Sequence, residues 1–203
     1  MRTIKGVIFD WGGVLIDDPL PGLIAFCSSA LGVSASVFEK AHSLVNDEFQ
    51  KGNISESQFW EKLCADLNIP LPKSQSLWFE AFQGSDSPRK DVFALAGSLR
   101  GNGYKTAILS NTETPAVEYF HEREYGCFDV AVFSCSEGTR KPERRIYGLT
   151  LERLNLQAKE AVFIDDKPEY VEGADKLGLN TILFSPDCEF RQFACVSVWS
   201  FRC

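Results

Sequence analysis

The sequence predicts an α/β fold, in which a doubly wound parallel sheet carries a small α-helical domain. Two patterns predict it. Short apolar runs, each stopped by polar or turn residues, alternate along most of the chain with segments whose apolar residues recur at helical spacing. Between residues 17 and 85 the short runs disappear and only the helical spacing remains. We therefore expect a core formed by residues 1–16 and 86–203 and a helical domain formed by residues 17–85.

The first strand organises the rest of the prediction. Val7-Ile8-Phe9 is a short apolar run typical of a strand that is buried on both faces, and it ends at Asp10. Gly12 and Gly13 follow and allow a tight turn. Open parallel sheets bind ligands outside the carboxyl ends of their strands, so Asp10 is expected to face a ligand.

The helical domain is predicted to hold four helices. Residues 20–31 and 36–51 each show helical periodicity, and Gly52-Asn53 stops the second. Ser55 and Gln58 have the spacing of a capping box and open a third helix, which Pro70 and Pro72 follow. A shorter helix is expected around residues 77–82. This domain is rich in Phe and Trp, most of which we expect in its own core.

Beyond residue 86 the alternation resumes. Helices are predicted at 89–99, from 115, at 144–154 and through 171–177, and strands at 104–109, 130–133, 161–164 and 181–184. Residues 136–142 are predicted to form a polar turn. The stretch 193–199 is compatible with an edge strand, and the sequence leaves its structure open.

Composition excludes several classes of function. The 203 residues carry a formal net charge of −7 with no offsetting block of Lys or Arg, which argues against a general binder of nucleic acid or anionic membranes. No apolar run reaches the roughly 20 residues of a membrane helix, and the first residues lead directly into a strand, so we expect a cytoplasmic protein. The seven cysteines are scattered without a CxxC pair, which favours reduced thiols. The oligomeric state stays open.

Polar groups suited to one chemical task follow four of the predicted strands. They are Asp10, Ser110 with Asn111, Lys141, and the pair Asp165-Asp166. In a parallel sheet these groups meet at one edge. Carboxylates at this edge suit Mg²⁺, which takes one or two protein carboxylates and keeps several waters. A serine, backbone amides and a lysine suit phosphate oxygens. The combination predicts phosphoryl transfer.

With these four groups in this order, the chain resembles the haloacid dehalogenase superfamily, whose Rossmann-like core carries an inserted cap where this chain has its helical domain. The resemblance implies that Asp10 is a nucleophile that takes the phosphoryl group as an aspartyl-phosphate. It implies that Ser110 and Asn111 bind the transferring phosphoryl oxygens. Lys141 would stabilise both the nucleophile and the developing charge.

The resemblance also implies a Mg²⁺ cofactor held by Asp10, the backbone carbonyl of Gly12, and the acidic pair. Within that pair Asp166 is expected to contact the metal directly, with Asp165 beside it or one shell behind. Phosphatases of this family usually carry a second Asp two residues after the nucleophile, as general acid and base. Here that position is Gly12, and a positioned general acid is worth roughly 10²–10⁴-fold in rate.

The function predicted from sequence is therefore a Mg²⁺-dependent phosphatase of a small phosphorylated metabolite, such as a sugar phosphate, whose cap excludes water and selects the leaving group. The absence of an acid at Gly12 leaves open an alternative, a catalytically weak or inactive phosphate-binding member of the same fold. A metal-independent haloacid dehalogenase is a third alternative. It is weaker because the adjacent acids Asp165 and Asp166 suit a cation, which such an enzyme does not use.

Some other polar residues are interpreted structurally. His42 and His121 lie in helical stretches without metal-ligand spacing and are expected at surface or interhelical positions. Arg140 has two interpretations from sequence, either attracting anions toward the cleft or solvating the start of a helix, and the second is favoured.

Overall fold

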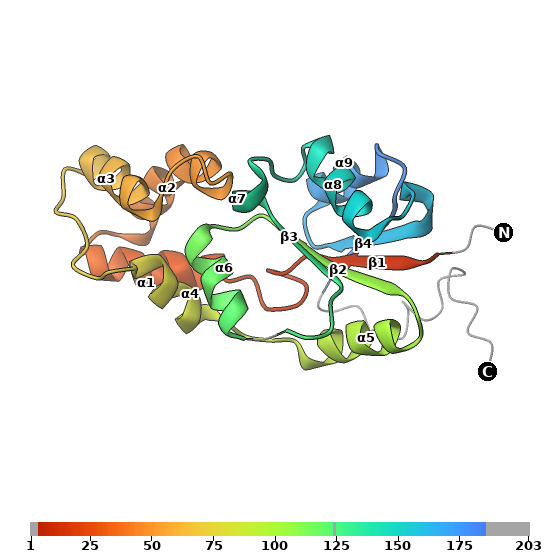
Figure 1. The fold of residues 1–203 in the computed structure, drawn as a ribbon. Coiled ribbons are helices and arrows are strands. Elements are labelled where there is room, and N and C mark those ends of the chain that lie inside the picture. The colour runs from red at the N-terminus through yellow and green to blue at the C-terminus, as the bar shows by residue number, and fades with distance from the viewer. Residues whose placement is uncertain (1–3, 124, 186–203) are drawn as a thin grey trace.

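The computed structural model describes residues 4–123 and 125–185 and confirms the predicted α/β fold (Figure 1). Its sheet has five strands in the order β3-β2-β1-β4-β5, and every neighbouring pair is parallel. The strands are β1 (Gly6–Phe9), β2 (Lys105–Ser110), β3 (Val130–Phe133), β4 (Ala161–Asp165) and β5 (Asn180–Leu183). The strand β1 lies in the centre, so its end faces the ends of β2 and β4 on either side.

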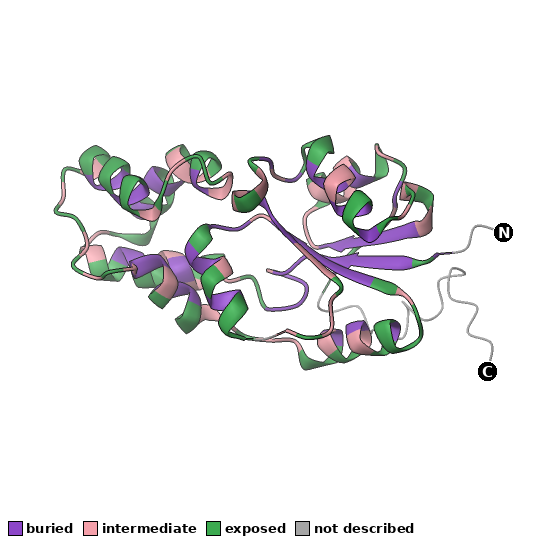
Figure 2. Ribbon diagram, in the orientation of Figure 1, coloured by how far each residue is buried: buried purple, intermediate pink, exposed green. Residues whose placement is uncertain are grey.

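Helices cover both faces of the sheet (Figure 1). Alternate residues of β1 enter different cores: Val7 and Phe9 pack with α5 (Lys90–Gly101), whereas Ile8 packs with α8 (Arg144–Leu154) and α9 (Pro168–Asp175). All four residues of β1 are buried, as Figure 2 shows for the central strands. This double coverage explains why the strand reads as a continuous apolar run.

The helices α1 (Leu20–Leu31), α2 (Ala35–Gln50), α3 (Glu56–Leu67) and α4 (Leu77–Ser85) form the cap, the helical group on the left of Figure 1. The predicted capping box of Ser55 and Gln58 is present. Much of their core is a cluster of aromatic rings, formed by Phe38, His42, Phe49, Phe59, Trp60 and Trp78. The domain boundaries at residues 16–17 and 85–86 stay a prediction.

Two short segments join the cap to the core, and they lie side by side. Ile16 forms a bridge with Pro88, the Asp17 amide donates to the Ser87 carbonyl over 3.0 Å, and the Arg89 amide donates to the Leu15 carbonyl over 2.9 Å. The chain therefore leaves and re-enters the core through one hydrogen-bonded pair of segments.

The remaining elements are α6 (Thr114–Glu122), the 3₁₀ helix Ala158–Glu160 and α7 (Ser134–Glu137). The last is a correction, because the sequence predicted only a polar turn over residues 136–142. Gly138 ends this helix in the left-handed conformation, with φ of 63°. A single helical turn is too short to show periodicity.

Four cysteines among the described residues, Cys27, Cys64, Cys127 and Cys135, are free thiols. Within the same residues no single helix is long and apolar enough to cross a membrane, although α1 and α2 would pass by length and composition as a pair bent by 108°. The predicted edge strand at 193–199 lies outside the described residues.

Candidate active site

The ends of the central strands meet at one cleft, as the sequence predicted. Asp10 follows β1, Ser110 ends β2, and Lys141 follows β3 and α7; all three line the same cleft, together with Gly12 and Asn111. Asp165 and Asp166 lie at the end of β4 and each places a carboxylate oxygen within 4.8 Å of one on Asp10. Residues more than 100 positions apart in the sequence are therefore neighbours.

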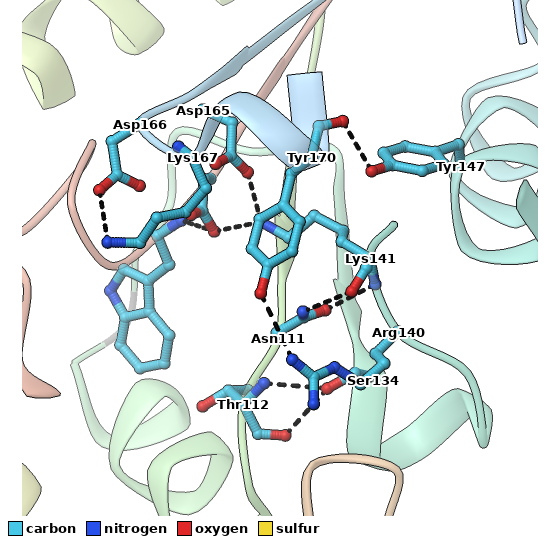
Figure 3. Close-up of polar contacts among 12 residues, drawn as sticks. Asn111, Thr112, Ser134, Arg140, Lys141, Tyr147, Asp165, Asp166, Lys167 and Tyr170 are labelled. Carbon is cyan, nitrogen blue, oxygen red and sulfur yellow. Dashed lines mark hydrogen bonds and ion pairs between the residues drawn. The ribbon is translucent and has the colours of Figure 1, made fainter. Parts of the chain in front are cut away.

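Lys141 lies between two carboxylates. Its Nζ atom is 2.8 Å from Asp10 Oδ1 and 2.6 Å from Asp165 Oδ2, and only 1% of its side chain is exposed. Burial alone would lower the pKa of Lys141, but the charges of Asp10 and Asp165 raise it above its ordinary value. The Nζ atom also lies 4.9 Å from the centre of the Tyr170 ring, a cation–π contact. Lys141 is therefore a fixed positive charge at the cleft (Figure 3).

Asp10 is anchored through one oxygen. Its Oδ1 atom accepts the Trp11 amide over 2.7 Å as well as the Lys141 ammonium. Burial raises the pKa of Asp10, Lys141 opposes that shift, and the charges of Asp165 and Asp166 add to it. Three acids packed this closely repel one another in their charged forms. A bound cation would remove that repulsion.

The two acids of β4 are not equivalent (Figure 3). Both oxygens of Asp165 are engaged by the protein, because Oδ2 pairs with Lys141 and Oδ1 accepts the Lys167 amide over 2.8 Å. Asp166 pairs with Lys167 Nζ through Oδ2 at 3.0 Å, while its buried Oδ1 has no hydrogen-bond partner. A buried carboxylate oxygen without a partner is costly unless a ligand satisfies it.

Gly13 creates the space in front of Asp166. Its φ is +93°, and a β-carbon at this position would lie 2.5 Å from the Asp166 carboxyl carbon. The carboxylate set of Asp10, Asp165 and Asp166, the partnerless oxygen and this space together fit a hard divalent cation, which prefers oxygen ligands.

Asn111 positions the lysine. Its side-chain amide donates to the Lys141 carbonyl over 3.0 Å and accepts the Lys141 amide over 2.8 Å. These two bonds fix the backbone on either side of the Lys141 side chain (Figure 3). Next along the loop, the Ser134 hydroxyl accepts the Thr112 amide and donates to the Thr112 carbonyl. The structure thus gives the Asn111 side chain a positioning contact that the sequence did not predict.

Gly12 lines the cleft, and Pro19 lies over it. A β-carbon on Gly12 would be 3.0 Å from Pro19 Cδ, tighter than an ordinary van der Waals contact. The position of a side chain two residues after Asp10 is thus partly filled by the segment that enters the cap.

The cap supplies one wall of the cleft. His42, Asn46 and Gln50 of α2 line it, as does Trp78 of α4, whose indole N–H donates to Glu113 of the core over 3.1 Å. Burial among aromatic rings lowers the pKa of His42 to about 4, so its imidazole is neutral at pH 7. His42 is interhelical, as the sequence suggested, but its place in the wall of the cleft was not predicted.

Of the two interpretations that the sequence left open for Arg140, the structure agrees with the one that places it at the cleft. It lines the cleft, its guanidinium donates to the Tyr170 hydroxyl over 3.3 Å, and it contacts Asp47 of the cap at 3.4 Å. It therefore links the lysine loop to α2 through Asp47 and to α9 through Tyr170, and Figure 3 shows the second of these contacts.

Comparison with known proteins finds several related sequences. The chain is 35% identical over 195 residues to mouse acyl-CoA dehydrogenase family member 10, matching 89% of this chain but spanning only 18% of that protein. It is 26% identical to the sesquiterpene phosphatase astK of Aspergillus oryzae, over 87% of this chain and 88% of that protein. It is 24% identical to a D-ribitol-5-phosphate phosphatase of Bacteroides thetaiotaomicron, over 93% and 96% respectively.

A solved structure has the same fold. A haloacid dehalogenase family enzyme from Bacteroides thetaiotaomicron, crystallised with magnesium and inorganic phosphate, superposes with a TM-score of 0.76 at 22% identity, covering 94% of this chain and 98% of that one. The family model for haloacid dehalogenase-like hydrolases matches residues 4–178, which include all four groups at the strand ends. The chain therefore belongs to the haloacid dehalogenase-like hydrolases.

Proposed function

We propose that this protein is a Mg²⁺-dependent phosphatase of a small phosphorylated metabolite, with Asp10 as the nucleophile. The observation that carries the proposal is the pairing of a buried Lys141 with Asp10 and Asp165 beside the partnerless oxygen of Asp166. The Lys141 ammonium can bind an anionic substrate. The three carboxylates around it can bind a divalent cation. Two relatives are phosphatases by name, and the superposed enzyme was crystallised with magnesium and phosphate.

The first step follows from how Asp10 is held. The Trp11 amide and Lys141 anchor Oδ1, so Oδ2 is the oxygen we assign to attack phosphorus. Attack forms an acyl phosphate and breaks the bond between phosphorus and the ester oxygen. Ser110 and the loop backbone that follows it bind the phosphoryl oxygens, and Lys141 balances their charge. Water then hydrolyses the acyl phosphate and regenerates Asp10.

Asp10, Asp166 and the Gly12 carbonyl would hold the magnesium ion, with Asp165 orienting Lys141 beside it. When bound, the ion supplies positive charge that offsets the negative charge of the phosphoryl oxygens. The proton that the departing alkoxide needs does not come from residue 12, because Gly12 has no side chain. The reaction should therefore favour substrates with good leaving groups.

Hydrolysis of p-nitrophenyl phosphate tests the proposal. With Mg²⁺ we expect turnover that a chelator removes and Mg²⁺ restores, and that Asp10→Asn lowers by at least about 10³-fold. Borohydride reduction during turnover should convert residue 10 to homoserine, detectable by mass spectrometry, because it reduces acyl phosphates. Undiminished hydrolysis by Asp10→Asn would rule out this mechanism.

Gly12 supports a second candidate, a phosphate-binding protein with little catalysis. It predicts that phosphate raises the melting temperature in the presence of Mg²⁺ while a panel of phosphorylated metabolites shows no turnover above the Asp10→Asn background. The dehalogenase alternative predicts halide release in the presence of a chelator. The partnerless carboxylate oxygen of Asp166 favours a metal-dependent reaction over it.

A further inference from the structure

The cap presents a row of polar side chains to the cleft. His42, Asn46 and Gln50 are spaced four residues apart on α2, so they lie on one face of that helix. All three line the cleft that also contains Asp10 and Lys141. Polar residues on a helix face usually point to solvent, whereas these face the site.

Each residue of the row carries a polar atom that is buried and lacks a hydrogen-bond partner. The atoms are His42 Nε2, Asn46 Oδ1 and Gln50 Oε1, three of the eight such side-chain atoms in the part of the chain that the structure describes. Only 6% of His42 is exposed. Leaving such atoms unsatisfied costs stability, so their alignment along one wall indicates that a ligand completes their hydrogen bonds.

The chemistry of the row selects the ligand. A neutral imidazole and two amides offer both donors and acceptors. The Gln50 side chain also hydrogen-bonds Glu113, which leaves its buried Oε1 as the acceptor toward the cleft. Hydroxyl groups both donate and accept, so they complement all three positions. The row itself carries no positive charge, and the cationic side chains that also line the cleft are engaged elsewhere, Arg140 with Asp47 and Lys167 with Asp166.

The remaining walls and the size of the cleft agree with a short, hydroxylated chain. Leu23, Trp78 and Phe82 give apolar surface beside the polar row, suited to the C–H groups of a carbon chain. The cleft volume of about 190 Å³ lies below the roughly 300–1,000 Å³ of pockets for drug-sized ligands.

We propose that His42, Asn46 and Gln50 bind the hydroxyl groups of the leaving group, and that the substrates are monophosphates of short sugars or sugar alcohols. This inference rests on the proposed phosphatase function and assigns its specificity to one face of α2. Asn46 and Gln50 act by binding, whereas His42 also holds the aromatic core of the cap together.

A matched pair of substrates tests the inference. A pentitol phosphate and pentyl phosphate have the same chain length and differ in their hydroxyl groups. We expect wild-type kcat/KM to favour the pentitol ester by at least about 10²-fold, because a site built for hydroxyl groups rejects analogues without them. Asn46→Leu and Gln50→Met should each reduce this ratio about two- to tenfold. Gln75→Met, the same change at an exposed cap residue away from the cleft, should leave both rates unchanged.

The outcomes separate the two proposals. Suppose that p-nitrophenyl phosphate is hydrolysed but kcat/KM is equal for the pentitol and pentyl esters, or that both cleft variants keep the wild-type ratio of these two values. The polar row then does not bind hydroxyl groups. If the wild type hydrolyses nothing above the Asp10→Asn background, the phosphatase proposal fails. In that case binding decides the inference: the pentitol ester should raise the melting temperature of Asp10→Asn protein with Mg²⁺ more than the pentyl ester does, and equal shifts would reject it.

Discussion

Pro19 Cδ lies 3.0 Å from the position that a β-carbon on Gly12 would occupy. Gly12 lacks the acidic side chain that is usual at this position in the family. Pro19, in the segment that enters the cap, also lies close to the place that such a side chain would occupy. The φ of Gly12 lies outside the left-handed region, so the obstacle to a side chain is contact rather than backbone strain.

This contact predicts that an added acid works only if Pro19 is also changed. Gly12→Asp alone should give little gain in kcat for an alkyl phosphate, because the new side chain displaces Pro19 or is itself displaced. Gly12→Asp with Pro19→Ala should raise kcat by up to about 10²-fold. Pro19→Ala alone is the control and should not raise it. A full gain from Gly12→Asp alone would show that the contact is not limiting.

The two acids of β4 should respond differently to added magnesium. Asp166→Asn weakens the proposed direct ligand of the metal, so activity should fall and then recover when the Mg²⁺ concentration is raised about 10- to 100-fold. Asp165→Asn leaves the buried Lys141 without one of its two partners, so activity should stay low at any Mg²⁺ concentration. Removing one partner of a buried ion pair also costs about 3–5 kcal/mol, which chemical denaturation would detect. Equal recovery of both variants would contradict this division of roles.

An ion pair between the cap and the core should help to hold the cap closed. At the end of α2, Lys51 Nζ lies 2.7 Å from Oε1 of Glu143 in the core. Lys51→Ala should raise KM about two- to fivefold with a smaller change in kcat, because a partly exposed pair contributes only about 0–1 kcal/mol. The effect should shrink as salt is added. Lys62→Ala is the matched control, because Lys62 pairs with Glu48 inside the cap; a similar rise in KM there would argue against the closure role.

His42 should make the folded protein sensitive to acid. Burial lowers the pKa of His42 from 6.5 to about 4 in the folded state, so below pH 6.5 the unfolded chain binds this proton more readily. Its contribution to stability is complete above about pH 6.5 and is lost as the pH falls toward 4, by at most about 3 kcal/mol. The difference in unfolding free energy between wild type and His42→Phe, measured by urea denaturation across that range, isolates this effect from other titrating groups. A pH-independent difference would contradict it.

The sequence predicted the fold because its signals were local. The apolar run of β1, the capping box at Ser55 and the polar residues that follow the strands each identify an element or its end without knowledge of the rest of the chain. The rule that parallel strands present their carboxyl ends at one edge then placed Asp10 near Lys141 correctly.

The unpredicted features depend on contacts between distant segments. The four-residue spacing of His42, Asn46 and Gln50 is visible in the sequence, but polar residues at that spacing are typical of a solvated helix face. Only the packing of the cap against the core directs that face to the cleft. The position of Pro19 over Gly12 and the contact of Arg140 with Tyr170 likewise arise from tertiary structure.

The bridge between Ile16 and Pro88 brings together the two points where the chain crosses between core and cap. An evolutionary event or a protein engineer could exchange everything between these points for a different insert, or join them by a short turn, while leaving the order of the sheet intact. Because we propose that the cap selects the substrate, we expect that grafting the α1–α4 segment of a relative onto this core changes substrate selectivity while the residues at the strand ends stay the same.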